Sequence, residues 1–271
     1  MQTETDPSIR KSIQHNGSER EYFVMLPKDY DPGKVYWGLV AAHGGGGNGR
    51  TFWMIERFRS LADELGLEAI VISPSFDLTD PPEESFPVLG GIAFLDAVVE
   101  DARLAYRLQP KILVTGYSRG GQFSHRYALW NPGKVEACAP LSAGSWTTPD
   151  GRLLITPTGE IKAPESFLLS SSNAKEVSKT HQYLFDSRIA EVAGTPAKAD
   201  ANQIPFLVMC GSLDEQFENA QQFVESLRSK DFQVESTWPR TPHGSRNDEE
   251  FRTEFEKYPR GTIEFFMKVT G

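Results

Sequence analysis

The stretch LVTGYSRGGQF, Leu113 to Phe123, places a serine between glycines directly after an apolar run. Within it, Gly116 to Gly120 reads G-x-S-x-G, with Ser118 at the centre. Such a serine can be an ordinary turn or helix-capping residue, because Ser and Gly are both common in turns. A sharp turn from a strand into a helix also needs small residues on both sides, and it lifts the central hydroxyl out of a sheet. The surrounding sequence decides between these two interpretations.

Strand-like and helix-like segments alternate on both sides of this motif. Ile112 to Thr115 before it is a strand-like apolar run, and Arg119 to Trp130 after it has helical spacing. The other expected strands lie at 24–26, 35–42, 68–72, 135–141, 205–210 and 233–238, and the other helices near 58–65, 91–108, 215–228 and the charged C-terminus. Buried strands that alternate with helices indicate an α/β fold with a mostly parallel sheet covered on both faces.

Two stretches interrupt this alternation. Residues 75–90 form a proline-rich loop, and the pattern weakens between 145 and 202, apart from a hairpin turn at 148–151. We interpret 145–202 as an insertion within a single domain, 1–271, and not as a separate domain. Both stretches follow strands, so we predict that they wall a substrate pocket at the carboxyl edge of the sheet. The candidate aromatic contacts are Trp146, Phe76 and Phe86, each of which could instead be a packing residue.

Composition restricts the partners of the chain. A net charge of −9 over 271 residues argues against nucleic acid, because phosphate binding needs a basic surface. No apolar run has the length of a membrane span. The first residues lack an apolar signal core, which indicates either a cytoplasmic protein or a chain whose signal peptide has been removed. Cys138 and Cys210 lie in strand-like runs and are expected to be buried thiols, with a bridge between neighbouring strands as the alternative.

A serine hydroxyl becomes a good nucleophile only when a base removes its proton. The chain has five histidines, and His243 is the candidate base because it follows the strand expected at 233–238 and has small neighbours. The other four are expected elsewhere: His15 and His181 in polar segments, His125 along the helix after Ser118, and His43 in a glycine-rich motif.

A catalytic histidine also needs a carboxylate that holds its tautomer. Asp214 follows the strand at 205–210 through a short turn, so it lies at a strand end like Ser118 and His243. Asp214 could instead cap the next helix, and Asp150 is the alternative acid. With Asp214 in this role, we predict that His243 lies within hydrogen-bond reach of both Ser118 and Asp214.

The motif HGGGGNG, His43 to Gly49, follows the strand at 35–42. Consecutive glycines allow the backbone to approach a ligand closely with its amides pointing inward. A phosphate-binding loop would need Lys and Ser/Thr at fixed spacing, and this motif has neither. We expect Gly44 or Gly45 to donate one N–H to an oxyanion, and His43 to brace the loop.

The second N–H donor is expected from Arg119, the residue after the serine. Its side chain has two candidate roles: it can pair with a carboxylate such as Asp77 or Asp214, or it can bind an acidic group of the substrate.

Together, GYSRGG, HGGGGNG and the order Ser118, Asp214, His243 resemble the α/β-hydrolase superfamily over residues 20–270. The branch that the motifs resemble contains poly(3-hydroxybutyrate) depolymerase-like and feruloyl or acetylxylan esterase-like proteins. This resemblance implies an α/β-hydrolase fold with the 145–202 insertion after the sixth core strand. This sequence departs from that branch in having no polymer-binding domain and few cysteines.

The resemblance implies a carboxylic ester hydrolase with a Ser118 nucleophile, a His243 base and an Asp214 acid. Its expected partner is a small or oligomeric ester, with no metal or organic cofactor. A peptidase or an acyltransferase could use the same residues. A binding protein without activity is the alternative from another class, although it would not need all of these residues together.

Overall fold

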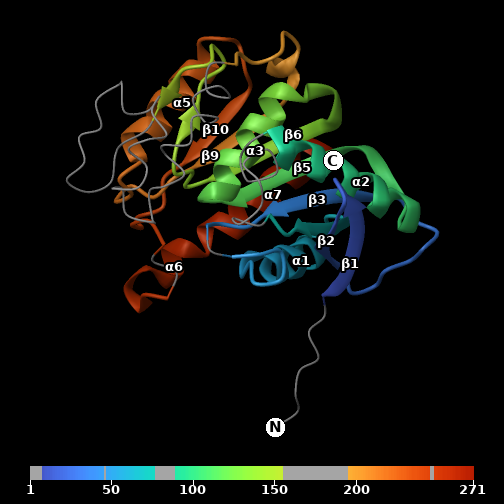
Figure 1. Cartoon of the computed structure of the whole chain (residues 1–271). Helices are drawn as coiled ribbons and strands as arrows, with labels where there is room; N and C mark the ends of the chain where they lie inside the picture. Colours follow the sequence, from blue (N-terminus) through green and yellow to red (C-terminus); the bar gives the residue numbers. More distant parts are fainter. Residues whose placement is uncertain (1–7, 46, 77–88, 155–194, 245–246) are drawn as a thin grey trace.

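Eight strands form one sheet in the order β1-β2-β4-β3-β5-β6-β9-β10 (Figure 1). The computed structural model describes residues 8–45, 47–76, 89–154, 195–244 and 247–271. The strands of this sheet are β1 (Ile9–His15), β2 (Ser18–Met25), β3 (Tyr36–Ala42), β4 (Ala69–Pro74), β5 (Leu108–Tyr117), β6 (Val135–Leu141), β9 (Phe206–Met209) and β10 (Val234–Thr237).

The sheet is parallel from β4 to β10 and antiparallel only at one edge. β3 pairs in parallel with both β4 and β5, and the parallel pairing continues through β6 and β9 to β10. At the other edge, β1 pairs antiparallel with β2, and β2 antiparallel with β4. The mostly parallel sheet predicted from the sequence is therefore confirmed, and β1 is an additional strand at its edge.

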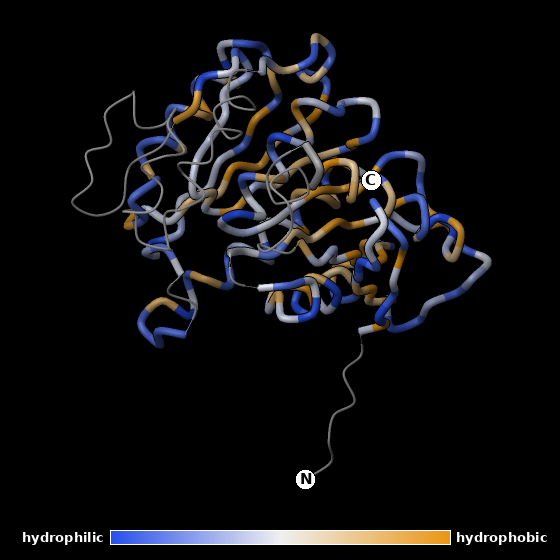
Figure 2. The backbone as a smooth tube through the Cα atoms, viewed as in Figure 1, coloured by the Kyte–Doolittle hydropathy of each residue, from blue (hydrophilic) through white to orange (hydrophobic). Residues whose placement is uncertain are grey.

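Helices cover both faces of the sheet, as the buried strands require. One face carries α2 (Leu89–Ala105), α3 (Arg119–Trp130) and α5 (Phe217–Arg228), and the other carries α1 (Met54–Leu65) and α7 (Lys257–Thr270). Side chains of β3 alternate between the two cores, with Val40 on the α3 side and Leu39 on the α1 side. The strands between these layers are the hydrophobic interior of the molecule (Figure 2).

The segment between β6 and β9 begins with a small hairpin. β7 (Trp146–Thr147) pairs antiparallel with β8 (Leu153–Leu154), and the predicted turn at 148–151 connects them. Most of the segment that we interpreted as a pocket-lining insertion, 155–194, lies outside the described residues, as does most of the proline-rich loop, 77–88. The roles of both segments in a pocket stay predictions.

The last helical elements before α7 are a short 3-10 turn, Glu249–Phe251, and α6 (Arg252–Phe255). No helix in the part of the chain that the structure describes is long and apolar enough to span a bilayer.

Cys138 and Cys210 are buried free thiols, and burial raises the pKa of both. The bridge considered as an alternative is therefore not formed.

Candidate active site

Ser118 lies in the turn between β5 and α3 with a backbone that is unusual for serine. Its φ is 58° and its ψ −111°, a strained conformation that few non-glycine residues adopt. The turn is tight because β5 and the start of α3 pack against β3. A side chain on Gly120 would place its Cβ 1.9 Å from the Ala42 carbonyl oxygen, and one on Gly116 would come within 2.7 Å of that oxygen. The two glycines of G-x-S-x-G are therefore required by this close approach.

Replacing Gly120 with alanine is expected to destabilise the fold by about 3 kcal/mol or more, because the new methyl group overlaps backbone atoms that cannot move without shifting β3. Gly133→Ala is the matched control, since a Cβ there meets nothing within 4 Å. Urea unfolding of both variants measures the difference. Equal midpoints for the two variants would show that the turn can relax around the methyl group.

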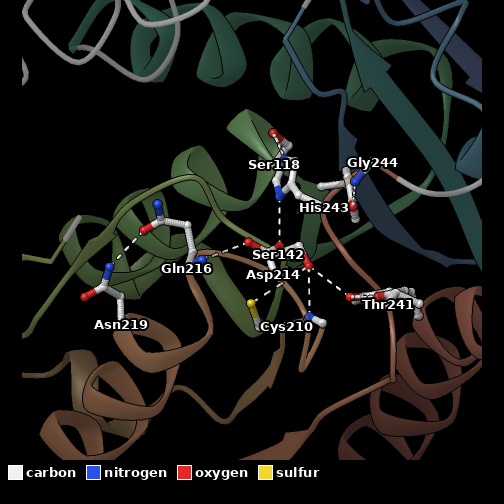
Figure 3. A network of polar contacts seen from close by, with 12 residues as sticks. Ser118, Ser142, Cys210, Asp214, Gln216, Asn219, Thr241, His243 and Gly244 are labelled. Carbon is white, nitrogen blue, oxygen red and sulfur yellow. Dashed lines mark hydrogen bonds and ion pairs between the residues drawn. The ribbon is translucent and has the colours of Figure 1, made fainter. Parts of the chain in front are cut away.

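His243 lies between Ser118 and Asp214. Its Nε2 is 3.0 Å from Ser118 Oγ, and its Nδ1 is 2.8 Å from Asp214 Oδ2 (Figure 3). The three residues follow β5, β9 and β10, three parallel strands whose carboxyl ends meet at one edge of the sheet. The Asp214 side chain is fully buried, whereas that of His243 keeps 27% of its surface exposed. In this arrangement His243 Nε2 is positioned to accept the proton of the Ser118 hydroxyl.

The Asp214 carboxylate has a hydrogen bond at each oxygen. Oδ2 accepts from His243, and Oδ1 accepts from the Gln216 backbone N–H at 2.9 Å. Gln216 is the residue before the first turn of α5, so Asp214 also supports the start of this helix, although it is not its N-cap residue. Asp150, the alternative acid, bonds to Thr148 and Arg152 in the β7–β8 turn.

Two opposing effects act on the pKa of His243. Burial lowers it, but the hydrogen bond that His243 donates to Asp214 and the charge of that carboxylate outweigh burial, with a smaller contribution from Glu215. The pKa of His243 is therefore raised above its usual value. Asp214 therefore favours the protonated form of the His243 imidazole.

The glycine-rich segment after β3 lies over Ser118 and Arg119. A Cβ on Gly44 would be 3.6 Å from Ser118 Cβ, and one on Gly45 would be 3.4 Å from Arg119 Cδ. His43 braces this segment: its Nε2 accepts from the Phe76 N–H at 3.0 Å, so its Nδ1 carries the proton and donates to the Gly44 carbonyl at 2.8 Å. Both ring nitrogens of His43 are therefore bonded to backbone groups, as expected for a residue that braces the loop.

Two further histidines, His125 and His15, have their described contacts with residues other than Ser118. His125 is fully buried; its Nε2 accepts from the Thr147 N–H, its Nδ1 donates to the Gly121 carbonyl, and burial lowers its pKa well below the usual value. His15 lies on β1 against the ring of Phe94 and is half-buried, whereas the sequence suggested a polar segment. His181 lies outside the described residues.

Trp146 and Phe76, two of the predicted substrate contacts, belong to the core. Trp146 has no exposed surface and stacks on Phe223, and Phe76 is 1% exposed and packs against Phe123. Side chains this deeply enclosed offer no face to a substrate, so the structure favours the packing role for both. The third candidate, Phe86, lies outside the described residues, as does Asp77, one of the two partners suggested for the Arg119 side chain.

A buried group of hydroxyls beneath Asp214 and His243 was not predicted from the sequence. Ser142 (Figure 3) follows β6 with a positive φ of 38°. Its hydroxyl oxygen accepts from the Gly211 N–H and lies 2.9 Å from the Tyr258 hydroxyl. Thr241 Oγ1 is 3.1 Å from the same hydroxyl. No local motif marks Tyr258, because it comes from α7 and meets this site only through the fold.

Comparison with known proteins identifies a matching family and several similar structures. A family model described as the alpha/beta hydrolase fold matches residues 39–246. A ferulic acid esterase aligns with a TM-score of 0.71 at 16% identity, over 97% of this chain and 98% of that one. A thermostable esterase from Pseudomonas putida aligns with 0.66 at 17%, over 97% and 83% of the two chains. An S-formylglutathione hydrolase from Staphylococcus aureus aligns with 0.58 at 18%, over 94% and 98%. At these identities the likeness shows the fold.

Proposed function

The chain belongs to the alpha/beta-hydrolase family, and we propose that it is a serine hydrolase that cleaves carboxylic esters. One observation carries the proposal: Ser118, His243 and Asp214 form a continuous hydrogen-bonded chain, with 3.0 Å and 2.8 Å between the bonded atoms. The names of similar structures, among them a ferulic acid esterase and a thermostable esterase, support an ester as the substrate class.

In the proposed reaction, Ser118 Oγ attacks the ester carbonyl carbon while His243 Nε2 accepts the hydroxyl proton. The tetrahedral intermediate collapses, the ester C–O bond breaks, and the alcohol leaves with the proton held by His243. Water then attacks the acyl-serine carbonyl while His243 accepts its proton. The bond between the acyl carbon and Ser118 Oγ breaks, His243 returns the proton to Oγ, and the acid is released. Asp214 keeps the Nδ1 proton in place and stabilises the imidazolium in both half-reactions.

The negative oxygen of the intermediate needs N–H donors close to Ser118. Arg119 is the first residue of α3, so its backbone N–H lies at a helix N-terminus, where negative charge is favoured. The second donor comes from the segment above it. Gly44 and Gly45 are the two candidates, because a Cβ on Gly44 would lie 3.6 Å from Ser118 Cβ and one on Gly45 would lie 3.4 Å from Arg119 Cδ.

Hydrolysis of p-nitrophenyl acetate, followed with and without a serine-directed fluorophosphonate, tests the proposal. We expect turnover that one equivalent of the fluorophosphonate abolishes, with the label on Ser118 as located by peptide mass spectrometry. Absence of turnover and of labelling would contradict the proposed function. A panel of esters that differ in acyl and alcohol groups then identifies the substrate class.

The pH dependence of kcat/KM should follow the ionisation of His243. A base must be neutral to accept a proton, so activity is lost as the pH falls through the pKa of this residue. Because Asp214 raises that pKa, we expect the acid limb of the profile to have its midpoint above about 6.5, the ordinary histidine value. A midpoint well below that value would contradict the assignment of His243 as a base paired with a charged Asp214.

A further inference from the structure

The loop that carries His243 is held from both sides by buried tyrosine hydroxyls. On the C-terminal side, the Gly244 backbone N–H donates to the Tyr117 hydroxyl at 3.0 Å. On the N-terminal side, Thr241 Oγ1 lies 3.1 Å from the Tyr258 hydroxyl. His243 therefore lies in a four-residue segment, 241–244, that is held two residues before it and one residue after it.

Tyr117 connects this segment to the nucleophile. It is the last residue of β5 and precedes Ser118, so its backbone carries the nucleophile while its side chain reaches the loop of the base. Its ring also lies against the imidazole of His243, with 5.5 Å between the centroids. Tyr117 is 6% exposed and its bond to Gly244 is part-buried, so water competes for this hydroxyl less than it would at an open surface.

Tyr258 connects the same segment to the loop of the acid. Its hydroxyl, fully buried, is 2.9 Å from Ser142 Oγ, and Ser142 Oγ accepts from the Gly211 N–H at 3.2 Å. Gly211 begins the turn that leads to Asp214, and the Asp214 N–H donates to the Gly211 carbonyl. One tyrosine hydroxyl therefore joins the base loop to the acid loop.

We propose that Tyr117 and Tyr258 are positioning residues for His243, and that their hydroxyls keep the imidazole aligned with both Ser118 and Asp214. This inference rests on the proposed function. Its physical basis is that proton transfer needs a nearly linear approach, so a small displacement of a catalytic group costs much more rate than stability. Gly244 has a φ of 74° and no side chain that could pack, so the bond from its N–H to Tyr117 is what ties this side of the loop to β5.

The test compares Tyr117→Phe and Tyr258→Phe with the wild-type enzyme, because phenylalanine keeps the ring and removes only the hydroxyl. Tyr22→Phe is the matched control: Tyr22 is equally buried and bonds to Asp101 on α2, away from His243. With p-nitrophenyl acetate, we expect kcat to fall about fivefold to thirtyfold in the first two variants, with little change in KM. The control should lose thermal stability and keep its kcat.

The acid limb of the pH profile gives a readout that simple destabilisation does not move. The groups that face His243 are Asp214 and Glu215 from the loop after β9, and Tyr117 from β5. Burial raises the pKa of Tyr117 and Tyr258, so both stay neutral. A looser contact with Asp214 leaves the lowering effect of burial dominant, and the limb moves to lower pH in both variants.

Thr241 offers a second way to break the Tyr258 bond. Thr241→Val removes the hydroxyl at constant volume, and Thr241→Ser keeps it. We expect Thr241→Val to lower kcat as Tyr258→Phe does, and Thr241→Ser to retain most of the activity. The Tyr258→Phe/Thr241→Val double variant should be no worse than Tyr258→Phe alone. Fully additive losses would show that the two hydroxyls act independently and would overturn this part of the inference.

The inference is overturned if Tyr117→Phe and Tyr258→Phe keep the kcat and the acid limb of the wild type, as the control does. Proton NMR of the His243 ring separates this result from a failure of the proposed function. A wild type without ester turnover contradicts the function, whereas the pKa of the His243 ring, measured in wild type and variants, still reports whether the hydroxyls fix it against Asp214. An unchanged pKa in the variants would overturn the positioning role.

Discussion

Replacing Ser118 with alanine is expected to abolish ester turnover while leaving the fold intact. The hydroxyl is the only group of this residue that contacts His243, and alanine keeps the backbone and the Cβ. Without it, no acyl-enzyme can form, and only the assistance of the N–H donors and of substrate binding remains. We expect kcat to fall by about four to six orders of magnitude, which is the loss found when the nucleophile of such a hydrogen-bonded chain is removed.

Ser124→Ala is the matched control for this variant. Ser124 is a buried serine of α3, the helix that follows Ser118, and its hydroxyl donates to the Gly120 carbonyl. We expect it to keep its activity and its labelling by the fluorophosphonate, whereas Ser118→Ala loses both and unfolds at nearly the wild-type temperature. If Ser118→Ala kept activity within about tenfold of the wild type, the nucleophile assignment would be wrong.

Sequence patterns predict best the elements that local periodicity determines, in which residues close in the sequence are also close in space. The bounds of α3 (Arg119–Trp130) and β6 (Val135–Leu141) agree with the prediction, because strand and helix periodicity are local. β1 (Ile9–His15) was not predicted, and only the end of β2 was. The sequence of β1, IRKSIQH, has few apolar residues because it is an edge strand, and only its pairing with β2 makes it a strand.

For the candidate site, sequence patterns predicted the residues that lie at strand ends, but not those whose position depends on how side chains from distant elements pack. Ser118, Asp214 and His243 each follow a strand, and a parallel sheet brings such positions to one edge. The same reasoning placed Trp146 at the pocket, but its side chain turns into the core against Phe223. Position at a strand end predicts the edge of the sheet and not the direction of a side chain. Tyr258 lies on α7, beyond any local motif.

Replacing Asp214 with asparagine is expected to lower kcat by about four orders of magnitude while changing the structure little. The amide can keep its oxygen on the Gln216 N–H, which leaves its NH₂ facing His243 Nδ1. An NH₂ group donates, so Nδ1 must accept and the ring proton moves to Nε2. The imidazole then points an N–H at Ser118 and cannot take its proton.

The same substitution moves the acid limb of the remaining activity in a direction that follows from the pKa of His243. Burial lowers this pKa and Asp214 more than compensates, so removing the carboxylate charge leaves burial dominant and shifts the limb to lower pH. Asp150→Asn is the control, because Asp150 bonds only within the β7–β8 turn among the described contacts and should keep kcat within about twofold. A large loss in Asp150→Asn together with full activity in Asp214→Asn would transfer the role of the acid to Asp150. If Asp214→Asn loses activity and Asp150→Asn does not, the size of the fall in kcat measures how much of the rate depends on keeping the ring proton of His243 on Nδ1.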